Sequence, residues 1–329
     1  MKITIIGCGT WGTALANLLV KANHDVFVYS DRANEIQELS LKRVHRHLEN
    51  VPIDQTIIFT TDLKESLKDA SIVVIATPSI YVRKSIEEAK SFLKPNQIIV
   101  VVSKGIEKDT LLTMSEIVEE VLDNKEFKVV ALLGPTHAEE VAIHQPTLIV
   151  ASSADKEAAI TVQKAFSNNY FRVYTNNDIF GAELCGALKN IIALAAGMSD
   201  GMGFGDNAKA AIITRGLAEI TRLGLALGCD FATFSGLAGV GDIVVTATSN
   251  HSRNHNAGYL LGQGYSLDET LEKVGMVVEG INALVAAKQL AAKNHVEMPI
   301  VNVVYGVIYE GLSPKDAVES LFARRLISE

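Results

Sequence analysis

The sequence predicts two domains of different class: a doubly wound α/β domain over residues 1–178 and an all-α domain over residues 179–329. The 329 residues exceed what one hydrophobic core usually supports, so two domains are expected. In the first half, short β-branched runs alternate with helical stretches, which indicates a parallel sheet with helical crossovers. In the second half, apolar residues recur at spacings of three and four, which indicates helices. The joint is expected between residues 174 and 185.

Eight runs of β-branched and apolar residues are the predicted strands of the first domain. They cover residues 3–6, 26–29, 57–60, 72–76, 98–102, 129–133, 148–151 and 171–174. Two of them, "IVVIA" at 72–76 and "IIVVV" at 98–102, are apolar at every position. Such runs are typical of strands buried on both faces of a parallel sheet. Helices are predicted between the strands, for example over 12–22, 82–93 and 156–166.

The second domain opens with two segments rich in Ala and Leu, "AELCGALKNIIALAAGMSDG" and "NAKAAIITRGLAEITRLGLALG". Further helical patterns follow at 269–273, 280–293, 301–309 and 314–321. No stretch there favours a strand, so this domain is predicted to contain helices only.

Charge and cysteine usage narrow the class of protein. The formal net charge of −8 makes electrostatic binding to nucleic acid or to an anionic membrane unfavourable. Cys8, Cys185 and Cys229 are far apart and form no CxxC pair, so neither a zinc site nor a disulfide framework is indicated. We expect no apolar run to approach the length of about 20 residues that is needed to span a bilayer. We therefore expect a soluble, cytoplasmic protein with reduced thiols and no membrane insertion.

Three glycines, Gly7, Gly9 and Gly12, form a G-x-G-x-x-G pattern between the first predicted strand and the first predicted helix. In this context the first glycine permits a tight turn, the second lets a pyrophosphate approach the backbone, and the third lets the helix pack on the strand. The free N–H groups of the helix start favour the same anion. The alternative is an ordinary turn with incidental glycines. The context favours a Rossmann-type dinucleotide site.

The end of the second predicted strand bears on which dinucleotide is bound. Asp31 lies 19 residues beyond Gly12, where a carboxylate is expected to bind the adenosine ribose. This residue favours NAD, because it repels a 2′-phosphate. Arg32 favours NADP. The two residues disagree, so the preference between NAD and NADP stays open.

The segment "TSNHSRNHNAGYLLG" is the strongest candidate for binding a phosphate. Capping residues precede a helical run, so free N–H groups are expected near Ser252, Arg253 and Asn254. The Arg253 guanidinium matches phosphate oxygens. His251 and His255, four residues apart, suggest a metal pair as the alternative. A third ligand is not evident, so no metal site is predicted.

Seven segments resemble the NAD(P)-dependent sn-glycerol-3-phosphate dehydrogenases and run in the order of that family. They are "GCGTWGTALA", "SKGIE", "GPTHAEE", "ELCGALKNIIALAAGMSDGMGFGDNAKAA", "GLAGVGD", "SRNHN" and "VVEG". The resemblance implies a helical C-terminal domain like that of 6-phosphogluconate dehydrogenases. It also implies interconversion of dihydroxyacetone phosphate and sn-glycerol 3-phosphate with NADH or NADPH, which supplies the backbone of phospholipids.

The same resemblance implies three residues for the chemistry. Lys189 matches the lysine that transfers the proton, Lys104 matches a second active-site lysine, and Asp242 matches a carboxylate that pairs with the first. Burial would bring the pKa of Lys189 toward the working pH, whereas Asp242 would raise it. The alternatives are a solvated helical lysine for Lys189, a loop lysine in water for Lys104 and a helix cap for Asp242.

Further contacts are implied by the resemblance. For the substrate they fall on Lys104, Gly134, Thr136, Lys189, Asp242, Thr246, Ser252, Arg253 and Asn254. For the cofactor they fall on Thr10, Trp11, Lys104, Ala138, Arg253, Val277 and Glu279, besides Gly7, Gly9, Gly12, Asp31 and Arg32. The alternative for Trp11 is a packing role, which is compatible with a cofactor contact.

One segment departs from the family pattern. In "VHRHLEN", residues 44–50, His47 and Glu49 replace an aromatic residue and a proline. No ligand contact is therefore carried over to this loop.

Two alternative functions remain at this stage. One is a β-hydroxyacid or 6-phosphogluconate-type dehydrogenase, which shares the two-domain plan. The other is a non-catalytic module that senses NAD. A homodimer is expected.

Overall fold

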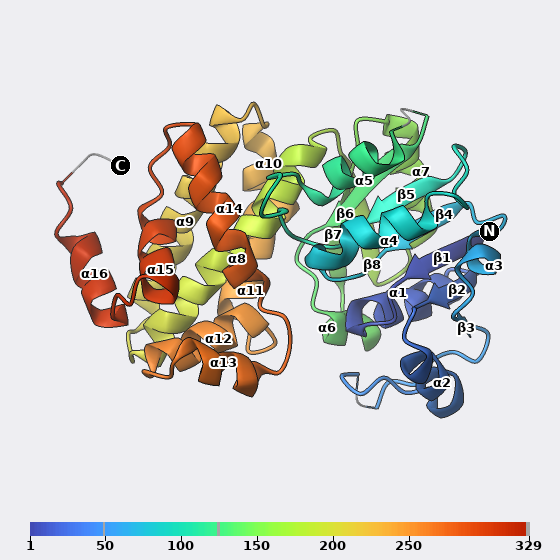
Figure 1. Ribbon diagram of the computed structural model, residues 1–329, viewed down its shortest axis with the longest axis horizontal. Coiled ribbons are helices and arrows are strands. Elements are labelled where there is room, and N and C mark those ends of the chain that lie inside the picture. Colours follow the sequence, from blue (N-terminus) through green and yellow to red (C-terminus); the bar gives the residue numbers. More distant parts are fainter. Residues whose placement is uncertain (49, 124–125, 327–329) are drawn as a thin grey trace. The chain divides into compact units, whose positions relative to one another are not determined.

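The computed structural model describes residues 1–48, 50–123 and 126–326, so Glu49 in the atypical loop lies outside the described residues. The chain divides into two compact units. The N-terminal unit comprises Met1–Lys104 and Leu112–Glu183, and the C-terminal unit comprises Gly105–Leu111 and Leu184–Glu329. Figure 1 shows the strands in the blue-to-green part of the ribbon and the later helices in the yellow-to-red part.

The N-terminal unit is built on one sheet of eight strands in the order β3-β2-β1-β4-β5-β6-β7-β8. All eight predicted strands are confirmed. Their bounds are β1 Lys2–Ile6, β2 Asp25–Tyr29, β3 Ile58–Thr60, β4 Ile72–Ile75, β5 Ile98–Val101, β6 Lys128–Leu133, β7 Thr147–Ser152 and β8 Phe171–Asn176. The helices between them are α1 Thr10–Lys21, α2 Ala33–Lys42, α3 Leu63–Leu67, α4 Val82–Ala89, α5 Met114–Leu122, α6 Ala138–Ala142 and α7 Lys156–Phe166.

One strand pair differs from the expected parallel sheet. β6 and β7 pair antiparallel, with Leu133 opposite Val150. A parallel pair needs a long crossover, usually a helix that runs back along the sheet. Between these strands lies only the five-residue α6, which is too short for that return. The other strand pairs are parallel.

The central strands are buried on both faces, as their continuous apolar runs predict. Along β4, Ile72 and Val74 enter one core, whereas Val73 and Ile75 enter the other. The first core also contains apolar side chains of α1 and α7, and the second contains those of α4 and α5. Helices therefore cover both faces of the sheet, as in a doubly wound fold.

The described part of the C-terminal unit is helical. It begins within α8, Ile179–Gly201, which starts in the N-terminal unit. The helices that follow are α9 Asp206–Ala226, α10 Phe231–Ser235, α11 Asp242–Thr248, α12 Arg253–Gly262, α13 Leu267–Val274, α14 Glu279–Lys293, α15 Pro299–Tyr309 and α16 Pro314–Phe322. The all-α prediction for this part of the chain is confirmed.

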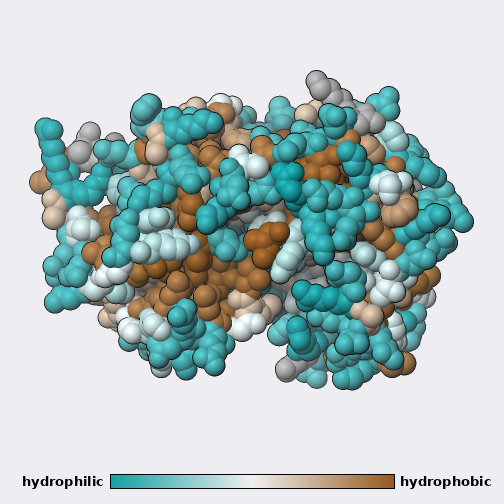
Figure 2. Space-filling model, in the orientation of Figure 1, coloured by the Kyte–Doolittle hydropathy of each residue, from teal (hydrophilic) through white to brown (hydrophobic). Residues whose placement is uncertain are grey.

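The long helix α8 corrects the expectation that no apolar run approaches the length of a membrane span. Its 23 residues include a window with a mean hydropathy of 1.5, which is sufficient by length and composition alone. However, 83% of that window is buried inside the protein. A helix that is apolar on all sides is also what the centre of a large helical core requires. Figure 2 shows that the visible surface is largely hydrophilic, with apolar residues gathered in one area of the helical unit.

Helices α8 and α12 approach each other closely through glycines on both. Gly197 and Gly201 lie one turn apart on α8, and Gly258 and Gly262 lie one turn apart on α12. A Cβ atom at Gly197 would come within 2.0 Å of the His255 carbonyl oxygen. A Cβ atom at Gly258 would lie 2.1 Å from a backbone oxygen of α8. Only glycine fits these positions without a shift of the backbone, so the contact fixes α12 against α8.

Glu219 on α9 is a buried carboxyl that caps another helix. It accepts hydrogen bonds from the backbone N–H groups of Ile300 at 2.8 Å and Val301 at 3.4 Å, in the first turn of α15. Burial raises the pKa of Glu219 to about 7, although these two bonds favour the ionised form. Two N–H groups at the start of α15 thus receive a partner, although burying the Glu219 carboxyl group costs free energy.

Replacing Glu219 with Gln is expected to stabilise the protein relative to wild type as the pH rises. Because the folded-state pKa is raised from 4.5 to about 7, wild type loses stability between these pH values as Glu219 ionises in the unfolded chain. The full effect is about 3 kcal/mol. The measurement is the free energy of unfolding in urea at about pH 5 and about pH 8. A difference between variant and wild type that is the same at both pH values would contradict this account.

Candidate active site

The glycine turn lies where the order of the strands reverses, because β1 pairs with both β2 and β4. Gly7 adopts a φ of +116° and donates its N–H to the Tyr29 carbonyl oxygen at 2.8 Å. A Cβ atom at Gly12 would lie 2.2 Å from the Gly7 oxygen, so helix and turn are in direct contact. A Cβ atom at Gly9 would meet nothing within 4 Å. The turn therefore leaves open space at the glycine expected to approach a pyrophosphate.

The residues around this turn also have defined places. Thr10 and Trp11 are the first residues of α1, whose N-cap Gly9 has no side chain to offer. Trp11 packs against a small cluster that includes Leu48 of the atypical loop, so its packing role is observed. Ala138, the first residue of α6, packs against the same cluster. The backbone N–H groups at the start of α1 fit an anionic ligand.

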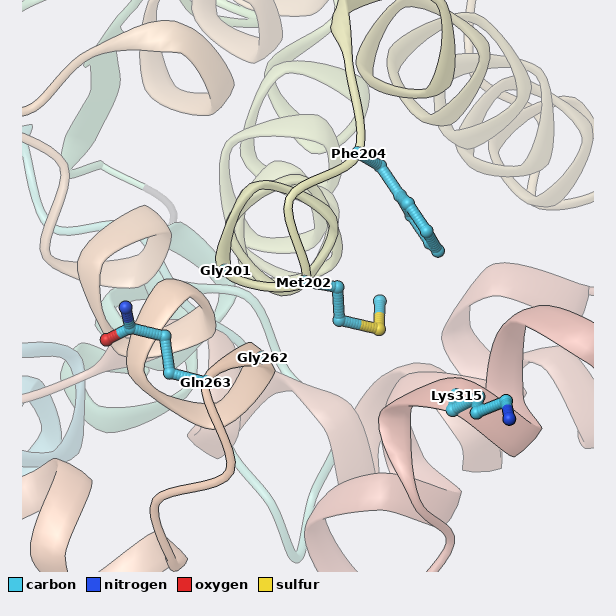
Figure 3. Close-up of a pocket in the computed structure, with 6 residues that line it drawn as sticks. All are labelled: Gly201, Met202, Phe204, Gly262, Gln263 and Lys315. Carbon is cyan, nitrogen blue, oxygen red and sulfur yellow. The ribbon is translucent and has the colours of Figure 1, made fainter.

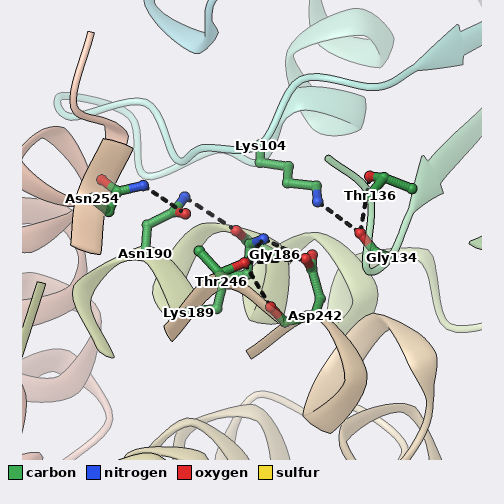
Figure 4. A network of polar contacts seen from close by, with 9 residues as sticks. All are labelled: Lys104, Gly134, Thr136, Gly186, Lys189, Asn190, Asp242, Thr246 and Asn254. Carbon is green, nitrogen blue, oxygen red and sulfur yellow. Dashed lines mark hydrogen bonds and ion pairs between the residues drawn. The ribbon is translucent and has the colours of Figure 1, made fainter. Parts of the chain in front are cut away.

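Lys104 and Thr136 both bind the backbone at Gly134. Lys104 follows β5, and Gly134 follows the neighbouring parallel strand β6. The Lys104 ammonium donates to the Gly134 carbonyl oxygen at 3.0 Å, and the Thr136 hydroxyl donates to the same oxygen at 3.1 Å (Figure 4). These residues share the carboxyl edge of the sheet with the glycine turn, the edge at which such folds bind ligands.

Lys189 is buried in the C-terminal unit, with only 5% of its surface exposed. Its ammonium forms an ion pair with Asp242 and donates to the Thr246 hydroxyl oxygen at 2.6 Å (Figure 4). Asp242 is fully buried and begins α11, and Thr246 lies one turn later on the same helix. The solvated alternative for Lys189 is therefore wrong. A buried ammonium with a paired carboxylate is suited to proton transfer.

The glycine-dense segment before Asp242 has an unusual backbone. Leu237–Gly241 forms one turn of π-helix that leads directly into α11. A Cβ atom at Gly239 would lie 2.0 Å from the Phe234 carbonyl oxygen, so this position needs a glycine. Wide turns of this kind occur often at functional sites. Here the turn sets where Asp242 begins its helix.

Ser252, Arg253 and Asn254 lie at the start of α12. Ser252 is the N-cap and accepts the His255 N–H at 3.2 Å. The exposed Arg253 donates to the Val277 carbonyl oxygen at 3.3 Å, which brings together two residues expected to contact cofactor. Glu279 lies two residues beyond Val277, as the first residue of α14.

Asn254 is buried and holds two other helices. Its amide donates to the Asn190 side-chain oxygen at 3.0 Å, and its own oxygen accepts the Gly280 N–H at 2.8 Å. Asn190 lies beside Lys189 on α8, so the start of α12 is tied directly to the helix that carries the lysine (Figure 4). Asn190 is a site residue that is not predicted from the sequence. Its position next to a candidate lysine in an otherwise apolar run was the available signal.

The two histidines of the same segment do not form a metal pair. His251 is exposed and precedes α12, whereas His255 is buried within it. The His255 Nε2 atom lies 2.8 Å from the Asp200 carboxylate, which also pairs with Lys209 at 2.8 Å. In the described ranges, no group of three or more His, Cys, Asp or Glu side chains is placed to hold a metal ion. His255 instead anchors α12 to α8.

One hollow in the C-terminal unit lies away from these residues. It has a volume of about 650 Å³ and is found at the C-terminal ends of α8 and α12 (Figure 3). Its lining consists of Gly201, Met202, Phe204, Gly262, Gln263 and Lys315. Gly201 lies more than three helical turns beyond Lys189, or roughly 18 Å along α8. None of the expected site residues lines this hollow.

Comparison with known proteins identifies the family. Its N-terminal model, "NAD-dependent glycerol-3-phosphate dehydrogenase N-terminus", matches residues 2–159, and its C-terminal model matches residues 178–319. The glycerol-3-phosphate dehydrogenase of Bacillus pumilus, named for both NAD and NADP, is 51% identical over 325 residues, which are 98% of this chain and 94% of that protein. The similarly named Bacillus subtilis protein is 50% identical over the same shares.

A solved structure agrees with this result. The crystal structure of glycerol-3-phosphate dehydrogenase from Coxiella burnetii is 36% identical, covers 98% of both chains and has a TM-score of 0.93. The chain therefore belongs to the NAD-dependent glycerol-3-phosphate dehydrogenase family, whose members interconvert dihydroxyacetone phosphate and glycerol 3-phosphate with NAD(P).

Proposed function

We propose that Lys189 transfers the proton when this enzyme interconverts dihydroxyacetone phosphate and sn-glycerol 3-phosphate. The observation that carries the proposal is the buried Lys189 ammonium bound to Asp242 and Thr246. NADH or NADPH supplies the hydride that reaches the ketone carbon of the substrate. As the ketone oxygen gains negative charge, the Lys189 ammonium gives it a proton, and in the reverse direction the neutral amine takes the hydroxyl proton. Asp242 orients the lysine and balances its charge.

Two residues of the N-terminal unit are proposed to orient the ketone end of the substrate. Lys104 and Thr136 both donate to the Gly134 carbonyl oxygen, so their donor groups are held at one place on the sheet edge. A lysine near the developing oxyanion lowers the energy of the transition state. Gly134 is proposed to contact the substrate through its backbone.

The phosphate of the substrate is proposed to bind at the start of α12. Ser252, Arg253 and Asn254 combine an N-cap, a guanidinium and an amide there. Backbone N–H groups at a helix start and an arginine are the usual ligands of a phosphate in proteins. In a protein of net charge −8, this local arrangement must provide the attraction that the whole surface does not.

The cofactor is proposed to bind at the glycine turn. Open space at Gly9 and the uncapped start of α1 support this placement. The proposed contacts are Gly7, Gly9, Thr10, Trp11, Gly12, Asp31, Arg32, Lys104, Ala138, Arg253, Val277 and Glu279.

We further propose that the enzyme works in the cytoplasm as a homodimer and supplies glycerol 3-phosphate for phospholipid synthesis. None of the three cysteines is joined in a disulfide, which supports a reducing compartment. Phe322 and Leu326, which are 85% and 94% exposed, are apolar side chains that a second copy would cover. The family assignment replaces the alternative of a β-hydroxyacid or 6-phosphogluconate-type dehydrogenase.

Lys189→Met is expected to lower kcat for dihydroxyacetone phosphate reduction by about 10²- to 10⁴-fold, the usual contribution of a general acid. The dissociation constant of NADH should stay within about twofold, because Lys189 is proposed to act on the substrate. The measurements are steady-state kinetics and NADH fluorescence titration. Unchanged turnover in this variant would show that Lys189 does not transfer the proton.

A second variant keeps this test valid if the buried Asp242 carboxylate, left without its partner, unfolds the protein. Lys189→Met combined with Asp242→Asn removes both charges. We expect this double variant to fold and to remain as inactive as the single one. Recovery of turnover in the double variant would contradict a proton-transfer role for Lys189.

Arg253→Ala is expected to weaken the preference for a phosphorylated substrate. The ratio of kcat/KM for dihydroxyacetone phosphate to that for dihydroxyacetone should fall about 10- to 100-fold, the value of one lost charge-assisted hydrogen bond. Arg222→Ala is the matched control, because that exposed arginine of α9 donates to the Glu297 carbonyl oxygen at 3.0 Å. An equal loss with both substrates would show that Arg253 does not bind the phosphate.

A further inference from the structure

The charged groups after β2 are already paired with one another. The Arg32 guanidinium lies 3.1 Å from the Glu35 carboxylate, one turn into α2. The Asp31 carboxylate lies 3.8 Å from the Lys84 ammonium of α4. Each of these two cations thus has a carboxylate partner at the place where the adenosine ribose is expected.

Glu35 also contacts the glycine turn itself. The Cys8 thiol, between Gly7 and Gly9, donates to the second Glu35 carboxylate oxygen at 3.3 Å. Burial raises the pKa of the Cys8 thiol to about 11, so it keeps its proton and remains a donor at neutral pH. One carboxylate therefore joins the turn proposed to hold the pyrophosphate to the arginine near the ribose.

The charge state of Glu35 is settled by its neighbours. Partial burial opposes ionisation, but the bonds from Arg32 and Cys8 outweigh it and hold the pKa of Glu35 below its usual value. Arg46 of the atypical loop favours the ionised form as well. Glu35 is thus a carboxylate at neutral pH and balances the charge of Arg32.

NADP differs from NAD by a 2′-phosphate on the adenosine ribose, and a nearby arginine is the usual partner of that phosphate. We propose that Glu35 makes this enzyme prefer NADH to NADPH by holding the Arg32 guanidinium that the 2′-phosphate would need. The proposal rests on the proposed cofactor site at the glycine turn. It resolves the conflict between Asp31 and Arg32 in the sequence, because the Arg32 guanidinium is already paired with Glu35 of α2.

The test compares kcat/KM for NADPH with kcat/KM for NADH in Glu35→Gln at low ionic strength. The ratio is expected to rise about fivefold, which corresponds to about 1 kcal/mol, the upper value for an exposed ion pair. Glu38→Gln is the matched control. It removes the same charge one turn later on α2, where the carboxylate pairs with Lys42 at 2.8 Å, and it should leave the ratio within about twofold.

A double variant separates occupation of Arg32 from simple repulsion by Glu35. In an Arg32→Met background, adding Glu35→Gln should change the ratio by less than about twofold. A gain that persists without Arg32, or no gain in Glu35→Gln alone, would overturn the proposal. Wild-type turnover of NADH with dihydroxyacetone phosphate, measured alongside, reports the function itself. Binding of adenosine 2′,5′-bisphosphate and of AMP to each variant reports the cofactor site. Failure of the proposed function, failure of the cofactor site and failure of the role of Glu35 can therefore be told apart.

Discussion

The ion pair of Lys189 and Asp242 is the constraint on which the described helical unit depends. Both side chains are removed from water, and neither charge would be tolerated there without the other. The fold must therefore place α8 and α11 so that these two side chains lie within hydrogen-bond distance. The π-helical turn of Leu237–Gly241 and the Thr246 hydroxyl serve this one arrangement. A buried charged pair of this kind adds little to stability, so the proton transfer that we propose for Lys189 is the best explanation of its presence.

A second contact of α8 extends this constraint to the start of α12, where we propose that the phosphate binds. Glycines on both helices bring the backbones of α8 and α12 together, and Asn254 adds a hydrogen bond to Asn190 beside the lysine. The start of α12 and the Lys189 ammonium are consequently parts of one rigid arrangement within the C-terminal unit. Glycines in helix interiors cost stability, and here they fix the position of the residues that we propose to bind the substrate.

Local patterns predicted the N-terminal unit well. Continuous apolar runs marked β4 and β5, and G-x-G-x-x-G marked the turn after β1, because backbone geometry there depends on neighbours in sequence. The antiparallel β7 was missed because strand direction depends on the length of the path through α6. The membrane-like length of α8 was missed because Glu183, Lys189 and Asp200 interrupt its apolar residues, although the mean hydropathy of one window still reaches 1.5. The pairings of His255 with Asp200 and of Asn254 with Asn190 join residues 55 and 64 positions apart, which no local pattern reveals.

If a protonated amine at position 189 supplies the proton, as we propose, a small amine added from solution should replace the missing side chain. In Lys189→Ala, small primary amines such as methylamine fit the space left by the side chain and carry the missing proton. We expect methylammonium to restore turnover at least about tenfold, with a rate that follows the protonated fraction of the amine. Tetramethylammonium, which has the charge but no proton to give, should not restore it. Equal rescue by both cations, or no rescue by methylammonium in a variant that still binds NADH, would contradict proton transfer from the Lys189 amine.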